Sequence, residues 1–428
     1  MTYEQAISYL ASAAKFGIQP GLQRIEKLLA LMGNPERQYR TIHVTGTNGK
    51  GSTTAFIAAI LNAASIRTGM FTSPHLVDYT ERIVINGNMI SEHDFAAAIQ
   101  YTSKVVEMMT ADGDDHPTEF EILTAAAFYH FAAAEVEYAV IEVGMGGLLD
   151  STNVIRPQAA VITNVAVEHT DRCGTSVAEI AAHKAGIIKP DVPVITAAKG
   201  EALNIIYSQA EILHAPLFTI DRDFFVQWKG EQDWQQQLTV RTNKYGNITN
   251  LRTKLLGDHQ AENCACAVMT AQVLAAQESR ITPEAIRSGV AAAVWPGRFE
   301  VLQAQPTVIV DGAHNPAGAE ALRLALNRYF GDQSITFVFG VLADKDIAGI
   351  ITGLFRPQDQ VITVAPLSDR AADAHMLSRQ IPAKRAEGAD TLDEAIVKAQ
   401  QWAGETGVIC ICGSLYLIGS ARKMIVTR

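Results

Sequence analysis

A glycine-rich stretch around a lysine has the composition of a phosphate-binding loop. Residues 41–59 read TIHVTGTNGKGSTTAFIAA, in which the apolar residues at the start indicate a buried strand and those after the glycines a helix. Backbone N–H groups and the positive end of the helix dipole would converge on the loop, and Lys50 adds a charge suited to the outer phosphates of a nucleotide. The usual spacing G-x-x-x-x-G-K-[ST] is not met, because Gly51 separates Lys50 from Ser52. We predict a nucleotide site here; a plain strand-to-helix turn is the alternative.

An acidic residue inside a second apolar run is the next candidate. Residues 138–153 read YAVIEVGMGGLLDSTN, with Glu142 followed closely by three glycines. A buried carboxylate is costly unless it is paired with a cation or bound to a metal. At the carboxyl end of a parallel strand, where α/β proteins bind ligands, one carboxylate together with phosphate oxygens can hold Mg²⁺. We therefore predict a magnesium ligand at Glu142; a pair with a buried cation is the alternative.

Other polar residues also follow expected strands. Asp311 begins the sequence DGAHNP, whose proline stands at an expected helix start. Ser73 follows a short strand at 68–72, where it is either a turn residue or, with a carboxylate nearby, a magnesium ligand. Asp346 and Ser414 stand at neighbouring strand ends, and helix N-caps explain both equally well.

Strands that alternate with helices must position these residues. Such alternation argues for parallel sheets with right-handed crossovers, and Trp-Pro-Gly at 295–297 is a linker signal. We predict an α/β protein with an N-terminal parallel-sheet ATPase domain at 1–295 and a smaller C-terminal α/β, Rossmann-like domain at 296–428. Within 200–250 the polar, alternating pattern indicates a hairpin. Helices are expected at 22–32, 118–132, 178–185 and 255–276, and buried strands of the second domain at Thr307–Asp311, Ile335–Val341, Gln360–Ala365 and Gly407–Cys412.

Composition excludes several classes of function. A net charge of −10 argues against a nucleic-acid binder, which would present a basic face. Five cysteines without zinc-site spacing indicate buried thiols in a reducing compartment. The N-terminus lacks the pattern of a signal peptide, and no apolar run approaches the ~20 residues of a membrane span. We expect a soluble, cytoplasmic protein, a monomer with no nucleic-acid or membrane partner.

The stretch TGTNGKGS also resembles the nucleotide loop of the folylpolyglutamate synthases, members of the Mur ligase superfamily of ATP-dependent amide-forming enzymes. The extra glycine after the lysine is characteristic of that family. The resemblance continues in TSPH at 72–75, YTERIVING at 79–87, TEFE at 118–121 and GDHQAEN at 257–263. It implies that ATP is bound by Thr47, Asn48, Gly49, Lys50, Gly51, Ser52, Asn263, Arg298 and Asp311.

The resemblance also implies two magnesium sites and a modified lysine. Ser73 and Glu142 would hold one ion, and His169 and Lys184 would lie at the second, with Lys184 converted to a carbamate. Here the sequence departs from the family twice: Glu168 precedes His169 where the family has Asp, and His183 precedes Lys184 where it has Glu. An unmodified lysine at a helix C-terminus would simply favour the helix dipole.

Substrate contacts follow from the same resemblance. Arg82 would meet a substrate carboxylate, with a solvated strand residue as the alternative. Thr118 and Glu121 form a capping-box pattern that explains both without chemistry, and a place for Glu121 near the reacting end of the substrate is the second interpretation. Ser151 and Ser414 are further substrate candidates, and His314 would contact the incoming glutamate.

The implied reaction joins L-glutamate to a reduced folate at the expense of ATP. The folate carboxylate attacks the γ-phosphate, and the amine of glutamate then displaces phosphate from the acyl phosphate. Lys50, Lys184, Asp311 and His314 are the expected catalytic residues. The alternatives are a bifunctional enzyme that also makes dihydrofolate from dihydropteroate, a Mur-type ligase for cell-wall precursors, and a non-catalytic nucleotide-binding protein.

Overall fold

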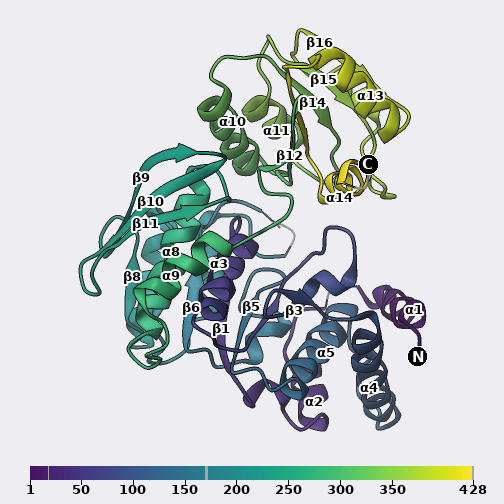
Figure 1. The fold of residues 1–428 in the computed structure, drawn as a ribbon. Helices are drawn as coiled ribbons and strands as arrows, with labels where there is room; N and C mark the ends of the chain where they lie inside the picture. The colour runs from purple at the N-terminus through teal and green to yellow at the C-terminus, as the bar shows by residue number, and fades with distance from the viewer. Residues whose placement is uncertain (18, 169–171, 427–428) are drawn as a thin grey trace. The chain divides into compact units, whose positions relative to one another are not determined.

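The computed structural model describes residues 1–17, 19–168 and 172–426. The chain divides into two compact units, shown in Figure 1. Unit 1 comprises Met1–Glu231, Gln237–Thr253 and Glu262–Val294, and unit 2 comprises Gln232–Gln236, Lys254–Ala261 and Trp295–Arg428. The main segment of unit 2 thus begins at the first residue of the Trp-Pro-Gly sequence.

An eight-stranded sheet forms the frame of unit 1. Strand β1 lies between β5 and β6 and is parallel to both, which confirms the predicted parallel sheet. Only β3 and β4, at one edge, run antiparallel to their neighbours. The spatial order is β4 (Asn88–Met89), β3 (Ile83–Ile85), β2 (Thr68–Phe71), β5 (Tyr138–Glu142), β1 (Arg40–Thr45), β6 (Ala159–Ile162), β7 (Val194–Thr196) and β8 (Leu217–Thr219).

The central strands are buried along almost their whole length. Every residue of β5 and all but the first residue of β1 are buried. Strands covered on both faces by helices carry such continuous apolar runs, which is why period-2 alternation is weak in this sequence. The polar residues that interrupt the runs, among them His43 and Glu142, are therefore the ones that need an explanation.

Within the described residues, eight α-helices lie wholly in unit 1, and α8 begins in unit 2 and continues in unit 1. Helix α5 begins as predicted, because the Thr118 hydroxyl accepts from the Glu121 N–H and the Glu121 carboxylate accepts from the Thr118 N–H, a capping box. Helix α9 lies along α3 (Figure 1), with Gly289 at their closest approach. The helices are α1 (Tyr3–Ala13), α2 (Gln23–Leu31), α3 (Lys50–Ala63), α4 (Glu92–Ala111), α5 (Glu119–Ala133), α6 (Val177–Ala185), α7 (Gly200–Ile212), α8 (Asp258–Leu274) and α9 (Pro283–Ala292).

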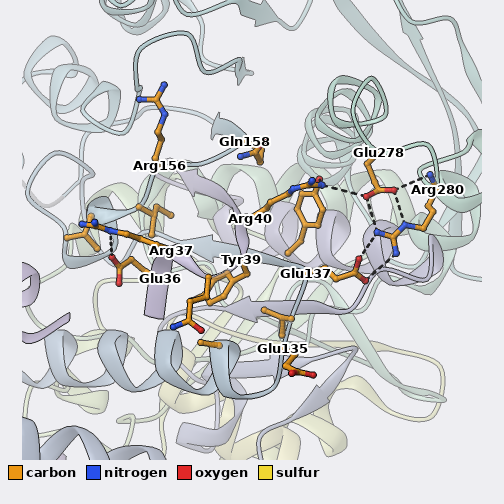
Figure 2. A pocket seen from close by; sticks show the side chains of 16 residues that line it. Glu36, Arg37, Tyr39, Arg40, Glu135, Glu137, Arg156, Gln158, Glu278 and Arg280 are labelled. Carbon is orange, nitrogen blue, oxygen red and sulfur yellow. Dashed lines mark hydrogen bonds and ion pairs between the residues drawn. The ribbon is translucent and has the colours of Figure 1, made fainter. Parts of the chain in front are cut away.

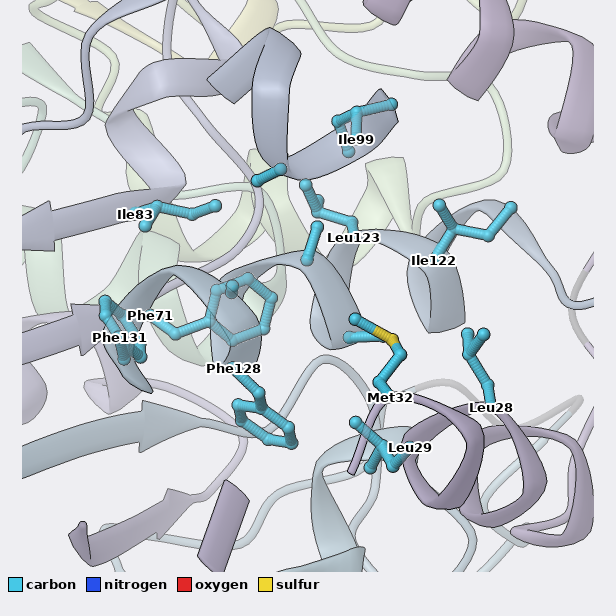
Figure 3. Packing of buried hydrophobic residues seen from close by; sticks show 14 of the residues in the cluster. Leu28, Leu29, Met32, Phe71, Ile83, Ile99, Ile122, Leu123, Phe128 and Phe131 are labelled. Carbon is cyan, nitrogen blue, oxygen red and sulfur yellow. The ribbon is translucent and has the colours of Figure 1, made fainter. Parts of the chain in front are cut away.

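Two apolar clusters hold several of the helices of unit 1 against the sheet. The first joins α2, α4 and α5 to β2, β3 and β5, and Figure 3 shows Leu28 and Leu29 of α2 near Met32, with Phe71, Phe128 and Phe131 at the sheet side. The second joins α6 and α7 to β6 and β7. Burial of this size is the main favourable term in folding, and it fixes the strand ends on which the polar residues stand.

A separate sheet forms the core of unit 2, and four of its strands match the predicted ones. The order is β12 (Glu300–Ala304), β13 (Thr307–Asp311), β17 (Val408–Cys412), β14 (Ile335–Phe339), β15 (Gln360–Thr363) and β16 (Arg385–Gly388). Its helices are α10 (Pro316–Phe330), α11 (Ile347–Leu354), α12 (Ala374–Ser378), α13 (Leu392–Ala403) and α14 (Leu415–Val426).

The hairpin expected within 200–250 is present, with one helix before it that the sequence did not reveal. A three-stranded sheet contains β9 (Phe224–Gln232), β10 (Gln235–Thr242) and β11 (Ile248–Thr253). Helix α7 precedes it, and its N-cap residue, Lys199, makes no side-chain capping bond. Among the described residues, no helix is both long enough and apolar enough to cross a membrane.

Candidate active site

The predicted phosphate loop lies between β1 and α3 and is hydrogen-bonded to the segment after β6. Gly49 has φ 82°, the left-handed region that glycine tolerates, and α3 begins at the next residue, Lys50. The Asn48 N–H donates to the Asn164 carboxamide oxygen at 2.8 Å, and the Thr47 N–H donates to the Asn164 carbonyl at 2.9 Å. Asn164 is a residue of the site that sequence reasoning missed; its position directly after a buried strand was the available signal.

Two lysine side chains meet at one backbone oxygen of this loop. Lys50 Nζ donates to the carbonyl oxygens of Gly46 and Thr47, both at 3.0 Å. Lys184 Nζ, from α6, donates to the same Gly46 oxygen at 2.8 Å. The two ammonium groups therefore stand beside each other next to the N-terminus of α3, where an anion is favoured by both the charges and the helix dipole.

Lys184 is the more unusual of the two lysines. Its side chain is 4% exposed. Burial, followed by the charge of Lys50, lowers the pKa of Lys184 to about 7. A good share of Lys184 is therefore neutral near neutral pH, whereas an ordinary lysine is fully protonated there.

Glu142 and Ser73 stand together at the ends of neighbouring strands. Glu142 is the last residue of β5 and is 3% exposed, and the Ser73 N–H donates to Glu142 Oε2 at 3.1 Å. Within the first turn of α3, the hydroxyl of Thr53 is buried without a partner among the described residues. One carboxylate with nearby hydroxyls fits Mg²⁺, which takes few protein ligands and completes its shell with water and phosphate. No cluster of three or more His, Cys, Asp or Glu suited to a metal occurs within 1–17, 19–168 and 172–426. The predicted second-metal residue His169 lies outside those residues.

A loop with buried ends and an exposed middle at Leu148 and Leu149 follows β5, and α6 lies directly against it. We call residues 143–150 the glycine loop. A Cβ atom at Gly147 would come within 3.0 Å of the carbonyl oxygens of His183 and Lys184, so only glycine lets α6 approach this closely. The His183 carbonyl accepts from the Leu148 N–H at 2.8 Å. The loop thereby holds the helix end that carries Lys184.

Two residues of unit 1 that are predicted to bind substrate, Arg82 and Ser151, lie in short 3-10 helices (Tyr79–Arg82 and Ser151–Val154). Arg82 Nε donates to His75 Nδ1 at 2.8 Å. Burial, followed by the charge of Arg82, lowers the pKa of His75 to about 4, so the ring is a neutral acceptor. Ser151 is buried beside Thr124, with 3.4 Å between their hydroxyl oxygens.

Glu121 does more than cap its helix. Besides the capping bond, its Oε2 accepts from Arg24 Nε at 3.1 Å, and its Oε1 is buried without a partner among the described residues. A buried carboxylate oxygen that lacks a donor is costly, and a ligand N–H would satisfy it. Arg24 is a second residue that sequence reasoning missed, because no motif surrounds it.

Asn263, predicted to bind ATP, lies against the phosphate loop. A Cβ atom at Gly49 would come within 2.3 Å of the Asn263 carboxamide oxygen. Gly49 is therefore needed for this close approach as well as for its positive φ. Asn263, on helix α8, and the phosphate loop both belong to unit 1.

The predicted residues of unit 2 cluster at the carboxyl ends of β13 and β17. Asp311 accepts from the N–H groups of Phe299 and Ala313, both at 2.8 Å, which shapes the turn after β13. Arg298 lies against Gly312, where a Cβ atom would come within 2.0 Å of its guanidinium. His314 Nδ1 lies 2.8 Å from the Gly312 carbonyl oxygen and must donate to it.

The two expected N-caps in unit 2 behave differently. Asp346 caps α11 by accepting from the Gly349 N–H at 2.9 Å, which confirms that interpretation. Ser414 is 3% exposed and its hydroxyl has no partner among the described residues, so it does not cap α14 with its side chain.

A cavity of about 1120 Å³ lies away from all these residues. Figure 2 shows it at the amino ends of β1 and β5, lined by Arg40, Glu137, Glu278 and Arg280 among others. Arg280 pairs with Glu137 at 2.6 Å and with Glu278 at 2.8 Å, so its charge is already neutralised. The cavity lies at the opposite edge of the sheet from the phosphate loop, and we assign it no part in the site.

Comparison with known proteins identifies the family. The model of the Mur ligase middle domain matches residues 44–271, and that of the Mur ligase glutamate ligase domain matches 297–415. The dihydrofolate synthase/folylpolyglutamate synthase of Bacillus subtilis (strain 168) is 37% identical over 425 residues, 98% of each chain. The chain belongs to the folylpolyglutamate synthase family of Mur ligases.

Solved structures of this family agree along the whole chain. A Mycobacterium tuberculosis folylpolyglutamate synthase complexed with ADP and AMPPCP superimposes with a TM-score of 0.89 at 35% identity, covering 98% of this chain and 99% of that one. A folylpolyglutamate synthase complex with AMPPCP and folate gives 0.86 at 34% identity, with both chains fully covered. The folylpolyglutamate synthase family consists of ATP-dependent ligases, and this chain is one of them.

Proposed function

We propose that the protein adds L-glutamate to the terminal carboxylate of a reduced folate, with ATP as the source of the activating phosphate. The observation that carries the proposal is the convergence of Lys50 and Lys184 on the Gly46 oxygen, beside Glu142 and Ser73. The family relatives that bind AMPPCP and folate support the choice of substrates.

The reaction has two steps. A carboxylate oxygen of the folate attacks the γ-phosphorus of ATP, the bond to the β-phosphate oxygen breaks, and ADP leaves. The amine of glutamate then attacks the carbonyl carbon of the acyl phosphate, loses a proton, and phosphate departs from the tetrahedral intermediate. Lys50 and the N–H groups at the start of α3 stabilise charge on the transferring phosphoryl group.

The residues at the strand ends fit magnesium. Glu142 would hold Mg²⁺ together with Ser73, and the bound ion would neutralise phosphate charge and orient the γ-phosphate. We propose a second ion near Lys184 and His169 on the strength of the family resemblance alone.

We propose that Lys184 is carbamylated. The neutral amine of Lys184 attacks CO₂, a C–N bond forms and one proton is released, which converts the neutral amine into an anionic carbamate. The pKa of about 7 supports this step, because only the neutral amine reacts. The modified side chain would offer carboxylate oxygens near the phosphate loop.

The remaining predicted residues receive substrate roles. In unit 1, Arg82 would bind a carboxylate of the folate, and Ser151 and Glu121 would bind nearby; the unpartnered Oε1 of Glu121 supports a ligand N–H there. In unit 2, Arg298 and Asp311 would serve ATP, and His314 and Ser414 would bind glutamate. We propose a cytoplasmic monomer, a location supported by five free cysteines.

A second candidate activity is the formation of dihydrofolate from dihydropteroate. The Bacillus subtilis relative is named for both reactions, and the two differ only in the molecule that supplies the carboxylate. Phosphate release separates them: the purified protein with ATP and glutamate should respond to a reduced folate, and a response to dihydropteroate as well would establish both activities.

The same assay tests the site. Lys50→Ala should abolish folate-dependent phosphate release while the thermal unfolding curve stays close to wild type, because the Lys50 ammonium donates to two carbonyls of the loop itself. Lys27→Ala, half-exposed on α2, is the matched control and should retain full activity. An unfolded Lys50→Ala protein whose remaining activity follows its folded fraction would contradict a phosphate role.

A further inference from the structure

A histidine lies fully buried in the middle of the strand that leads into the phosphate loop. His43 is 0% exposed in β1, and the neighbouring strands contribute Ile141 and Ala160 opposite it. Side chains along a strand alternate between its faces, so His43 shares one face with Thr45. An apolar residue would fill such a position without the cost of burying polar atoms.

The ring of His43 takes part in a chain of three hydrogen-bonded side chains. Its Nε2 lies 2.8 Å from Thr152 Oγ1. The Thr152 hydroxyl in turn lies 2.6 Å from Asp150 Oδ1. All three side chains are buried.

The direction of each bond in this chain is determined by its last member. The Asp150 carboxylate can only accept, so the single hydroxyl hydrogen of Thr152 goes to it. Nε2 of His43 must then carry a hydrogen and donate to Thr152. His43 Nδ1 is left without a hydrogen and has no partner among the described residues, so Nε2 is the ring atom through which His43 acts on its neighbours.

Asp150 links the hydrogen-bonded chain of His43 and Thr152 to the glycine loop. Its Oδ2 accepts from the Met145 N–H at 2.9 Å, and its Oδ1 accepts from the Thr152 N–H at 3.0 Å. Thr45, on the same face of β1 as His43, donates to the Gly146 carbonyl at 2.6 Å. Two side chains of β1 therefore tether the loop that follows Glu142.

We infer that His43 is a positioning residue of the ligase reaction, which acts through Thr152 and Asp150 to set the conformation of the glycine loop and of Ser151 beside it. The inference rests on the proposed function for its kinetic consequence. The structural part of the inference, that His43 keeps the glycine loop ordered, does not depend on the proposed function. A misplacement of about 1 Å in such a loop is enough to cost a large factor in rate.

Two pairs of variants test this role. His43→Leu removes the donor, whereas His43→Gln keeps an N–H near the position of Nε2. Thr152→Val removes the hydroxyl at almost constant shape, whereas Thr152→Ser keeps it. Thr152→Val reports on the same link should His43→Leu fail to fold.

The first readout is amide hydrogen exchange in the protein without substrates. Exchange at Met145 and Thr152 should become roughly tenfold faster in His43→Leu and Thr152→Val and stay near wild type in the two conservative variants. Unchanged exchange in the disruptive variants overturns the inference. This readout stands even if the wild type shows no folate-dependent phosphate release, which would overturn the proposed function instead.

The second readout is steady-state kinetics of the folded variants. The disruptive variants should lose roughly tenfold in kcat/KM for folate while KM for ATP stays within about twofold, and His43→Gln should recover most of the loss. The double variant should lose less than the product of the single losses, because both remove the same link. Equal losses for folate and ATP, or no recovery by glutamine, would show that His43 is merely structural.

Discussion

At the residue scale, the buried position of Lys184 makes the folded protein less stable when that side chain is protonated. Its pKa of about 7 lies below the 10.5 of an unperturbed lysine, because burial and Lys50 disfavour the charge. Below pH 7 both the folded and the unfolded chain carry this proton. Between pH 7 and 10.5 the unfolded chain holds a proton that the folded one has released, so the free energy of unfolding rises with pH in that window.

Lys184→Met removes this dependence. We expect the variant to be inactive and yet more stable than wild type at or below pH 7, with the difference narrowing toward pH 10.5. Urea unfolding across this range, in buffers free of CO₂, measures it, and Lys27→Met serves as the control on an exposed lysine. Parallel pH profiles for wild type and Lys184→Met would show that the site does not depress this pKa.

Glu142→Gln tests the proposed role of Glu142 as a magnesium ligand. Glutamine can still accept from the Ser73 N–H, so the fold should remain, but the loss of one negative charge weakens binding of a hard cation. We expect turnover to fall by at least about a hundredfold, with added Mg²⁺ restoring only a small part of it. Glu201→Gln, on the exposed side of α7, should behave as wild type. A magnesium titration of Glu142→Gln that reaches wild-type turnover would remove Glu142 from the site.

Residue type and local spacing were enough to select Lys50 and Glu142 as candidates. A lysine among glycines and a carboxylate at the end of an apolar run are unusual within a few residues of sequence. The contact between Lys184 and Gly46 joins residues 138 positions apart, and that between His43 and Thr152 joins residues 109 apart. A local sequence pattern cannot predict contacts between residues so far apart. They follow from the three-dimensional arrangement of the strands and helices.

At the element scale, α9 packs so closely against α3 that a methyl group added at Gly289 would push the two helices apart. A Cβ atom at Gly289 would lie 2.3 Å from the Ile60 Cα atom, which is backbone and cannot turn aside. Because α3 begins at Lys50, its displacement would also move the phosphate loop.

Gly289→Ala should therefore destabilise the protein by about 1–3 kcal/mol and raise KM for ATP. Gly353→Ala is the matched control, since that glycine also lies in a helix and its Cβ atom would meet nothing closer than 3.6 Å. The control should be neutral or stabilising by roughly 0.5–1 kcal/mol. Equal effects of the two substitutions on thermal unfolding would show that α3 and α9 can separate freely.

Elements with strong end signals were predictable, and those without were not. The capping box of α5 and the strand at Thr307–Asp311 appear where the sequence indicates them. Helix α7 was missed because its N-cap residue is Lys199 and its first residue is a glycine, neither of which marks a helix start.

At the scale of the whole molecule, neither the net charge nor the number of cysteines predicts what the protein binds or how it reacts. Both properties depend on where individual side chains lie. A protein with net charge −10 needs a few local cations to bind anionic substrates, and Lys50 and Lys184 beside the phosphate loop are the candidates. All five cysteines are free and buried, and burial raises the pKa of the Cys264 thiol to about 12. Such thiols are poor nucleophiles.

The thiols of the native protein should therefore react with a thiol reagent only as fast as local or global unfolding exposes them. We expect almost no labelling under native conditions and five labelled thiols after denaturation, with no need for a reductant during storage. The control is a surface variant such as Ser208→Cys on α7, which should label at once. Rapid labelling of one or more thiols in the native wild type would contradict their burial.

The strand order of the eight-stranded sheet has a consequence for synthesis on the ribosome. Strand β1 ends at Thr45, but its two partners, β5 and β6, begin only at Tyr138 and Ala159, and Asn164 then holds the phosphate loop. A nascent chain that stops before Tyr138 contains the complete glycine–lysine sequence with neither of the strands that support it. Stalled chains of increasing length should remain protease-sensitive around β1 until β6 has emerged, and should bind no ATP analogue before then. The nucleotide loop is synthesised early, but it can bind nucleotide only after β5 and β6 have paired with β1.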